Sequence, residues 1–228
     1  MRTIYTCDIG SIRAGNFGWA RCVPKHKAVP LGSTNISDLV NCIKKDMADG
    51  MSIAMGFECP LFIPVPYPNG DLGRGREGEG NRAVFAQTGA TVATLGIQQA
   101  AWILRTIHPC GANHFKFTTD SSTWPPSDNH PVLFCWEAFV AGNAHANDHM
   151  RDAATATMCF IDNEMRLEEV TAVTALEPFS LIQAVALWAG WSTQIDQLHS
   201  SVLVIKPDSR YEGVIESFYP GVPANHQY

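Results

Sequence analysis

Two short apolar runs in this sequence each end in an acidic residue, and this feature constrains the fold more than any other. The run 4–8 ends at Asp8, and the run 53–58 ends at Glu58. A carboxylate at the carboxyl end of a buried strand lies where open α/β sheets form their ligand crevices. If the two strands are neighbours in one sheet, the two carboxylates can hold a divalent cation between them. The alternative is two unrelated acids at points where strands emerge into solvent.

Composition narrows the class of protein. The chain has 228 residues, of which 46% are hydrophobic, which is typical of one large soluble domain with a substantial core. We expect no membrane span, because no run approaches the roughly 18 consecutive apolar residues that one needs. We also expect no signal peptide, since a charged and then apolar amino-terminal pattern is missing. The seven cysteines form no CxxC pair, which favours reduced thiols in a cytoplasmic protein over disulfides or a zinc site.

The charge balance limits the possible partners. The net charge is −6, from 16 basic and 22 acidic residues. A protein that grips nucleic acid through its whole surface is normally basic, so this balance argues against tight nonspecific binding. A local contact with nucleic acid stays possible. The oligomeric state and the partner proteins are left open.

The first quarter of the chain reads as three strands, one helix and a fourth strand. Ser37 is the expected N-cap of the helix, after which apolar residues recur at helical spacing. Short connections predict that the first three strands are antiparallel. The helix then supplies a right-handed crossover, so that the fourth strand lies parallel to the first. The predicted strands span 3–8, 17–23, 27–31 and 52–58, with the helix at 37–49.

The rest of the chain alternates helices and strands. We expect one domain over residues 1–207, followed by a polar tail at 208–228 that is partly disordered. No internal repeat or low-complexity segment is visible. The predicted elements are a buried helix at 83–107, a polar loop at 111–130, a strand at 132–138, a helix at 144–163, an apolar helix at about 178–191 and a strand at 202–205.

A glycine-rich segment at 69–82 carries Arg74, Arg76 and Arg82. Its spacing partly matches a dinucleotide-binding fingerprint, but it does not connect a strand directly to a helix, so we reject that interpretation. One interpretation is a mobile flap whose arginines bind an anionic substrate. The other is a solvated surface loop.

Four polar residues share one face of the helix predicted at 144–163. They are His145, Asp148, His149 and Asp152, spaced i, i+3, i+4 and i+7. Such a stripe opposite apolar residues is usually a solvated face. Here it lies in the first turns after a strand, where a helix can lean over neighbouring strand ends. Glu137, near the end of the strand at 132–138, is a further acid in this region.

The order of elements and several short motifs resemble the RNase H-like superfamily. The closest resemblance is to the uncharacterised family described as predicted RNase H-fold nucleases, and it spans about residues 3–160. The sequence departs from the family pattern at Glu58, where Asp is commoner, and at Asn147, where a doubled Asp is expected. The motifs that carry the resemblance are Asp8-Ile9-Gly10, Gly18-Trp19-Ala20, Phe57-Glu58-Cys59-Pro60-Leu61, Trp136-Glu137-Ala138 and Asn147-Asp148-His149-Met150-Arg151-Asp152-Ala153.

The resemblance implies a mixed five-stranded sheet flanked by helices and a Mg²⁺-dependent or Mn²⁺-dependent nuclease. Two metal ions about 3.5–4 Å apart activate a water and stabilise the leaving oxygen in such enzymes. Carboxylates suit magnesium, which prefers hard oxygen ligands. Asp8 is expected to bridge the ions, with Glu58 and one or both of Asp148 and Asp152 as further ligands.

Roles for the other acid and the two histidines stay open. Glu137 is an extra ligand, a supporting acid or a salt-bridge partner for an arginine of the glycine-rich segment. His145 or His149 could shuttle a proton, although each is more often a surface histidine.

Two alternatives to a nuclease remain open. The first is a non-catalytic RNase H-like binding module. The second is a phosphotransferase related to sugar kinases and actin-like ATPases, because Ile9-Gly10-Ser11 resembles their first phosphate loop. Those enzymes need a second such domain, for which 228 residues leave little room. DNA, RNA and small nucleotides are all open as substrates.

Overall fold

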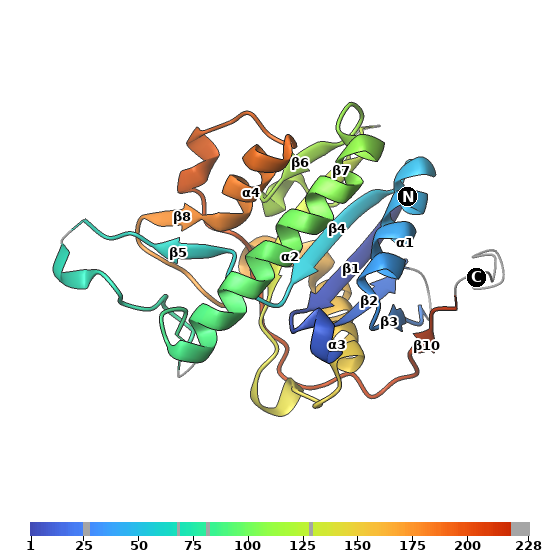
Figure 1. Cartoon of the computed structure of the whole chain (residues 1–228), viewed down its shortest axis with the longest axis horizontal. Coiled ribbons are helices and arrows are strands. Elements are labelled where there is room, and N and C mark those ends of the chain that lie inside the picture. The colour runs from blue at the N-terminus through green and yellow to red at the C-terminus, as the bar shows by residue number, and fades with distance from the viewer. Residues whose placement is uncertain (25–27, 68, 81–82, 128–129, 220–228) are drawn as a thin grey trace.

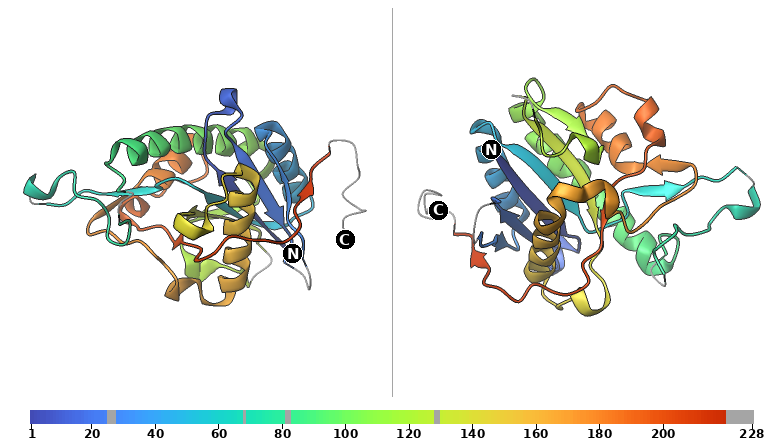
Figure 2. Two further views of the ribbon diagram at one scale, coloured as in Figure 1. Left: turned by 90° about the horizontal axis from the view of Figure 1, so that it is seen from below. Right: turned by 180° about the vertical axis from the view of Figure 1, so that it is seen from behind.

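A computed structural model describes residues 1–24, 28–67, 69–80, 83–127 and 130–219. A mixed β-sheet forms the middle layer, with helices on both of its faces (Figures 1 and 2). Among the described residues, no helix combines the length and the apolar character needed to cross a membrane. The α/β class expected from the sequence is therefore confirmed, and the sheet runs mostly parallel.

The sheet has eight strands in the order β10-β3-β2-β1-β4-β7-β6, and β9 pairs with β7. As predicted, the first three strands are antiparallel, and β4 lies parallel to β1. Parallel pairing continues from β4 to β7 and from β7 to β6 and β9. The strands are β1 (Arg2–Asp8), β2 (Gly18–Cys22), β3 (Leu31–Ser33), β4 (Ser52–Phe57), β6 (Lys116–Thr118), β7 (Val132–Ala138), β9 (Val204–Ile205) and β10 (Glu216–Ser217).

Three of these strands extend the five-stranded sheet that was expected. β6 lies inside the predicted polar loop, and β9 covers only the end of the strand predicted at 202–205. β10 lies inside the predicted polar tail and pairs with β3, so this part of the tail belongs to the sheet. The third strand begins at Leu31 rather than residue 27, and residues 25–27 lie outside the described ranges.

The described residues form four α-helices that flank the sheet, namely α1 (Ile36–Ala48), α2 (Gln87–Gly111), α3 (His149–Asn163) and α4 (Leu181–Ala189). α1 begins at a different cap from the one predicted: Asn35 Oδ1 accepts a hydrogen bond from the Ser37 N–H at 2.9 Å. Ser180 caps α4, and the residues before it form a strand instead of helix. That strand, β8 (Pro178–Ser180), pairs with β5 (Phe62–Pro64) in a separate two-stranded sheet. The short 3₁₀ helices are η1 (Ile12–Ala14), η2 (Asn69–Asp71), η3 (Ser121–Thr123), η4 (Gly142–Ala144), η5 (Glu164–Glu169) and η6 (Asp196–His199).

The two faces of the sheet bury different cores. Successive side chains of a strand point to opposite faces, so Tyr5 and Cys7 pack with α1, α2 and α4, while Ile4 packs in the cluster of Phe134 and Phe160 of α3. Thr6 also faces α3, and its hydroxyl accepts a hydrogen bond from the Thr157 hydroxyl at 2.8 Å. The central strand β1 is therefore fixed from both sides.

A close approach of α3 to β2 depends on a glycine. A Cβ atom at Gly18 would lie only 2.4 Å from the His149 carbonyl carbon and 2.6 Å from the Met150 nitrogen. Gly18 is also the antiparallel partner of Asp8. The absence of a side chain at Gly18 thus lets the first turn of α3 lie directly against the carboxyl end of β1.

Gly18→Ala should destabilise the protein by about 1–3 kcal/mol, because an extra methyl group in a closely packed contact forces the backbone to shift. It should also move His149 away from Asp8. Gly70→Ala is the matched control, since no heavy atom of a described residue lies within 4 Å of a Cβ at Gly70 and its φ is not positive. Urea denaturation gives the free energy of unfolding of both variants. Equal values would contradict the close approach of α3 to β2 at Gly18.

Candidate functional site

Asp8 and Glu58 lie side by side at the carboxyl ends of β1 and β4. The parallel register pairs Cys7 with Phe57, and the Glu58 N–H donates to the Cys7 carbonyl oxygen at 2.8 Å. The two side chains are close enough for Glu58 to be one of the influences that lower the pKa of Asp8. The prediction that these two strands are parallel neighbours is confirmed, and it brings the two acids together.

Asp8 is a buried acid with an unusual affinity for protons. Only 7% of the residue is exposed. Burial, assisted by the negative charge of Asp152, raises the pKa of Asp8 to about 6, although hydrogen bonds and charge from His149 and a hydrogen bond with Glu58 act in the opposite direction. The loss of hydration on burial therefore outweighs the favourable contacts of Asp8, and the ionised form is disfavoured.

The start of α3 supplies two carboxylate–imidazole pairs. His149 Nδ1 lies 2.6 Å from Asp8 Oδ2, and His145 Nδ1 lies 2.5 Å from Asp152 Oδ2. The backbone N–H of Ala146 donates to Asp152 Oδ1 at 2.7 Å. Asp152 is 1% exposed, so for this residue the solvated-face interpretation is wrong.

The prediction that α3 begins near residue 144 is also wrong. Asp148 is the N-cap of α3, and its Oδ1 accepts a hydrogen bond from the Arg151 N–H at 3.0 Å. His145 therefore precedes the helix, and the four polar residues do not form one helical stripe. Asp148 is exposed and serves the helix end, whereas Asp152 belongs to the acid cluster with Asp8 and Glu58.

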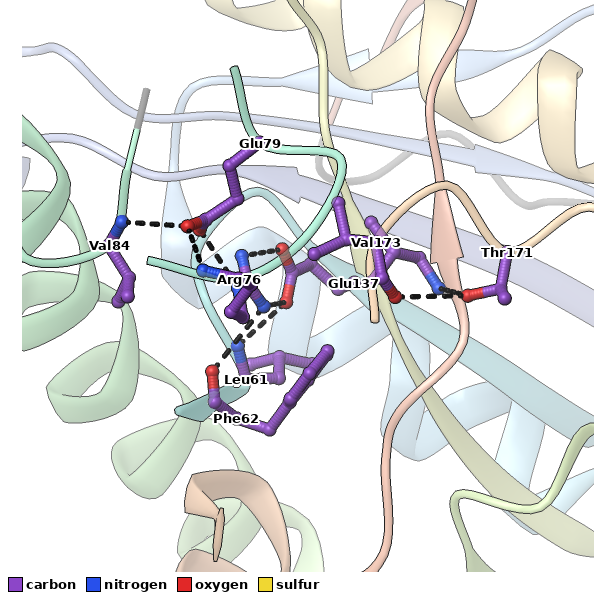
Figure 3. A network of polar contacts seen from close by, with 9 residues as sticks. Leu61, Phe62, Arg76, Glu79, Val84, Glu137, Thr171 and Val173 are labelled. Atoms are coloured by element: carbon purple, nitrogen blue, oxygen red, sulfur yellow. Dashed lines mark hydrogen bonds and ion pairs between the residues drawn. The ribbon is translucent and has the colours of Figure 1, made fainter. Parts of the chain in front are cut away.

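Glu137 lies at the end of β7 and is held by a buried arginine (Figure 3). Both nitrogens of the Arg76 guanidinium fork donate to its carboxylate at 2.7 Å, and the Leu61 N–H donates at 2.9 Å. Burial raises the pKa of Glu137, while Arg76 and the Leu61 N–H lower it. Of the three roles left open for Glu137, the structure has it in a salt bridge with an arginine of the glycine-rich segment.

Arg76 is an internal residue and does not extend from a solvated flap. It is 6% exposed, packs 4.5 Å above the Phe62 ring, and donates from Nε to Glu79 Oε1 at 2.8 Å. The other Glu79 oxygen accepts from the backbone N–H groups of Arg76 and Val84. The interpretation of Arg76 as a surface contact for substrate is therefore corrected: its donors are used inside the protein.

The two other arginines of the segment differ from Arg76. The Arg74 side chain is 78% exposed and lies 3.6 Å from Asp71. Its role in substrate binding stays a prediction. Arg82 lies outside the described residues.

A cavity of about 420 Å³ opens beside the two strand-end acids. Asp8, Glu58, Arg76 and Glu137 are its charged lining residues. The first turn of α2 and apolar side chains complete the wall. These remaining lining residues are Ile9, Cys59, Pro60, Ala86, Gln87, Thr88, Gly89, Val92, Ala138 and Phe139.

The donor chemistry of this region is that of a hard-cation site, but its side chains are not gathered around a common point. Within the described ranges, no group of three or more His, Cys, Asp or Glu side chains is arranged to hold a metal ion. Asp8 and Asp152 each face an imidazole, and Glu137 faces Arg76. Zinc is disfavoured as well, because burial raises the pKa of the neighbouring Cys7 and Cys59 thiols well above the usual value.

Comparison with known proteins assigns no family to this chain. It matches no protein-family model, and neither a curated protein nor a solved structure is significantly similar to it. The functional argument therefore depends on the residues of the site itself.

Arg76→Met should cost about 3–5 kcal/mol of stability, because it leaves the Glu137 and Glu79 carboxylates buried without their partner. Arg74→Met is the matched control and should change stability by less than about 0.5 kcal/mol, since exposed ion pairs contribute little. Chemical denaturation compares the two variants. Similar losses for both would show that the buried arginine does not hold this segment in place.

Proposed function

We propose that this protein is a divalent-cation-dependent phosphodiester hydrolase of the RNase H-like type, similar to the predicted RNase H-fold nucleases. The observation that carries the proposal is that Asp8 and Glu58 end the adjacent parallel strands β1 and β4, and that Asp152, in the first turns of α3, lies near enough to Asp8 to raise its pKa. These acids come from segments up to 144 residues apart (8 to 152) and are buried or partly buried together.

The topology supports this assignment. Three antiparallel strands lead into a parallel pair formed by β1 and β4, and β7 continues the parallel part of the sheet. α3 then lies across β1 and β2 on the face opposite α1. The resemblance drawn from the sequence implies an acid in the first strand, an acid ending the fourth strand and an acid on a late helix, and this arrangement accommodates all three.

The acid cluster suits Mg²⁺ or Mn²⁺ in its chemistry. Its donors are carboxylate oxygens, and a bound cation would offset the burial that raises the pKa of Asp8. Asp8, Glu58 and Asp152 are the residues that would hold the cation. When bound, it would supply an activated water and stabilise the charge on the leaving oxygen.

The chain's own residues prepare the site in three ways. His149 Nδ1 forms a hydrogen bond with Asp8 Oδ2 at 2.6 Å and so fixes the orientation of that carboxyl group. His145 and the Ala146 N–H fix the orientation of Asp152. Arg76 neutralises Glu137 and so keeps a further negative charge from repelling an anionic substrate.

The substrate is a short or locally held nucleic acid. The net charge of −6 gives no broad attraction for a long polyanion. The Arg76 and Arg21 guanidinium groups are engaged by carboxylates within the protein. Since the acids line a cavity of about 420 Å³, we expect one or two nucleotides to be held closely.

A non-catalytic binding module is the second candidate. The observation in its favour is that His149, His145 and Arg76 already compensate Asp8, Asp152 and Glu137. The kinase-like alternative is weaker. Gln99 Nε2 donates to the Gly10 carbonyl oxygen at 2.7 Å, so α2 holds the turn that would have to act as a phosphate loop.

Cleavage of labelled single-stranded, duplex and branched DNA and RNA tests the proposal. Turnover should require Mg²⁺ or Mn²⁺ and fail with Ca²⁺, whose looser coordination misplaces the attacking water. Asp8→Asn, Glu58→Gln and Asp152→Asn should each lower turnover about 10²-fold or more. Asp148→Asn is the matched control, because asparagine also caps helices well and this residue lies outside the acid cluster.

A folded protein that cleaves none of these substrates with either metal would reject the hydrolase and favour the binding module. Loss of activity in Asp148→Asn as large as in Asp152→Asn would instead contradict the assignment of Asp152 as the helix acid of the site.

A further inference from the structure

A second crevice lies where two strands share one edge of β7. β6 pairs with the first part of β7, at residues 132–134, and β9 pairs with its last part, at 137–138. β6 stops pairing with β7 at Thr118. The segment that leads into β9 begins to pair with β7 at Leu203, whose carbonyl oxygen accepts from the Glu137 N–H at 2.9 Å. Crevices at the carboxyl ends of parallel strands are frequent ligand sites in α/β proteins.

This crevice contains a cavity of about 470 Å³. It shares no lining residue with the cavity beside Asp8 and Glu58. Its volume is in the range of small-molecule sites. The residues that line it are Thr118, Thr119, Asp120, Ser121, Leu167, Glu168, Thr171, Gln183, Gln197, Ser200, Ser201, Val202 and Leu203.

The chemistry of the lining selects against anions and offers mostly neutral polar groups. Most of its polar groups are hydroxyls and amides, and no Lys, Arg or His is among the lining residues. An anion would find no cation there and would meet the carboxylates of Asp120 and Glu168. For a cation, one of the two Asp120 oxygens is already engaged, because Oδ1 accepts from the Ser122 N–H at 3.0 Å and the Ser122 hydroxyl at 2.7 Å; titration with putrescine separates a cation from a neutral ligand.

One buried side chain in this cavity has hydrogen-bonding capacity to spare. Gln183 is 1% exposed, and its Nε2 donates to the Thr119 hydroxyl at 3.0 Å. Its Oε1 is buried and accepts no hydrogen bond from any described residue. A buried amide oxygen without a donor is costly, so it marks a place where a donor from outside the chain would be stabilised.

Thr119 is a second nearly buried polar residue whose hydrogen-bonding capacity is not fully used. It is 5% exposed, and its hydroxyl oxygen accepts from Gln183, which leaves its own proton to be donated. α4 carries Gln183 beside the end of β6 (Figure 1), so the amide and the hydroxyl are held on two packed elements. Donors and acceptors that alternate in this way match the hydroxyl groups of a sugar, each of which both donates and accepts.

We propose that this crevice binds a neutral polyhydroxylated molecule, such as a single sugar ring or a cyclic polyol. Thr119 and Gln183 form the floor of the site, and the rim residues Ser200 and Ser201 supply further hydroxyls. This site is independent of the acid cluster and does not depend on the proposed hydrolase activity.

Titration of ¹⁵N-labelled full-length protein with D-glucose, D-ribose and myo-inositol tests the proposal. At least one of them should produce saturable amide shifts at Thr118, Thr119 and residues 200–203, with a dissociation constant of about 1 mM or tighter. Putrescine and inorganic phosphate are the charged comparison probes and should produce none there. The amides of Asp8 and Glu58 should not move.

Gln183→Met should weaken this binding about tenfold or more, because it keeps the side-chain length and removes both polar ends. Gln98→Met, at an exposed glutamine of α2, is the matched control and should bind as the unmodified protein does. Ser201→Ala at the exposed rim gives a second test that does not disturb the core, and it should also weaken binding.

The proposal is overturned if none of the three polyols gives saturable shifts in this region. It is equally overturned if putrescine or phosphate binds there in their place. Shifts that remain unchanged in both Gln183→Met and Ser201→Ala would place the bound polyol elsewhere and would also reject the site.

Discussion

The structure depends on how the negative charge of Asp8 is accommodated at the end of the central strand. β1 is flanked by β2 and β4 and covered by helices on both faces, so its last residue lies in a poorly hydrated position. A carboxylate there needs hydrogen-bond donors or positive charge nearby. His149 and Glu58 favour the ionised form of Asp8, whereas the negative charge of Asp152 opposes it. The glycine at position 18 is part of the same arrangement, because it allows α3 to bring His149 close enough.

A second group of buried charges stabilises the wall of the cavity beside Asp8 and Glu58. Arg76 joins Glu137 at the end of β7 to Glu79 in the glycine-rich segment, and Glu79 in turn binds the backbone just before α2. A buried ion pair contributes little net stability compared with apolar packing, but losing one partner is costly. The function of this network is therefore to fix where a long segment lies, which in turn shapes the cavity next to Asp8 and Glu58.

Much of the central sheet could be predicted from the sequence, because short apolar runs with β-branched residues and short connections specify strands and their neighbours. The approach of Asp8 to Glu58 followed from that order alone. The start of α3 could not be placed, since Asp148 reads equally well as a residue inside a helix and as its N-cap. The burial of Arg76 was missed, because nothing in the glycine-rich segment marks it as internal, although a salt bridge between Glu137, 61 residues away, and an arginine of this segment was among the roles left open. β10 was missed because two residues in a polar segment give no periodicity.

The most direct test of this account is an NMR titration of the Asp8 carboxyl carbon, assigned by comparison with Asp8→Asn. The account predicts a midpoint near pH 6 in the absence of divalent cations. Added Mg²⁺ should lower that midpoint, because a cation bound among Asp8, Glu58 and Asp152 competes with the proton on Asp8. A midpoint near the usual value of about 4, unmoved by Mg²⁺, would contradict it.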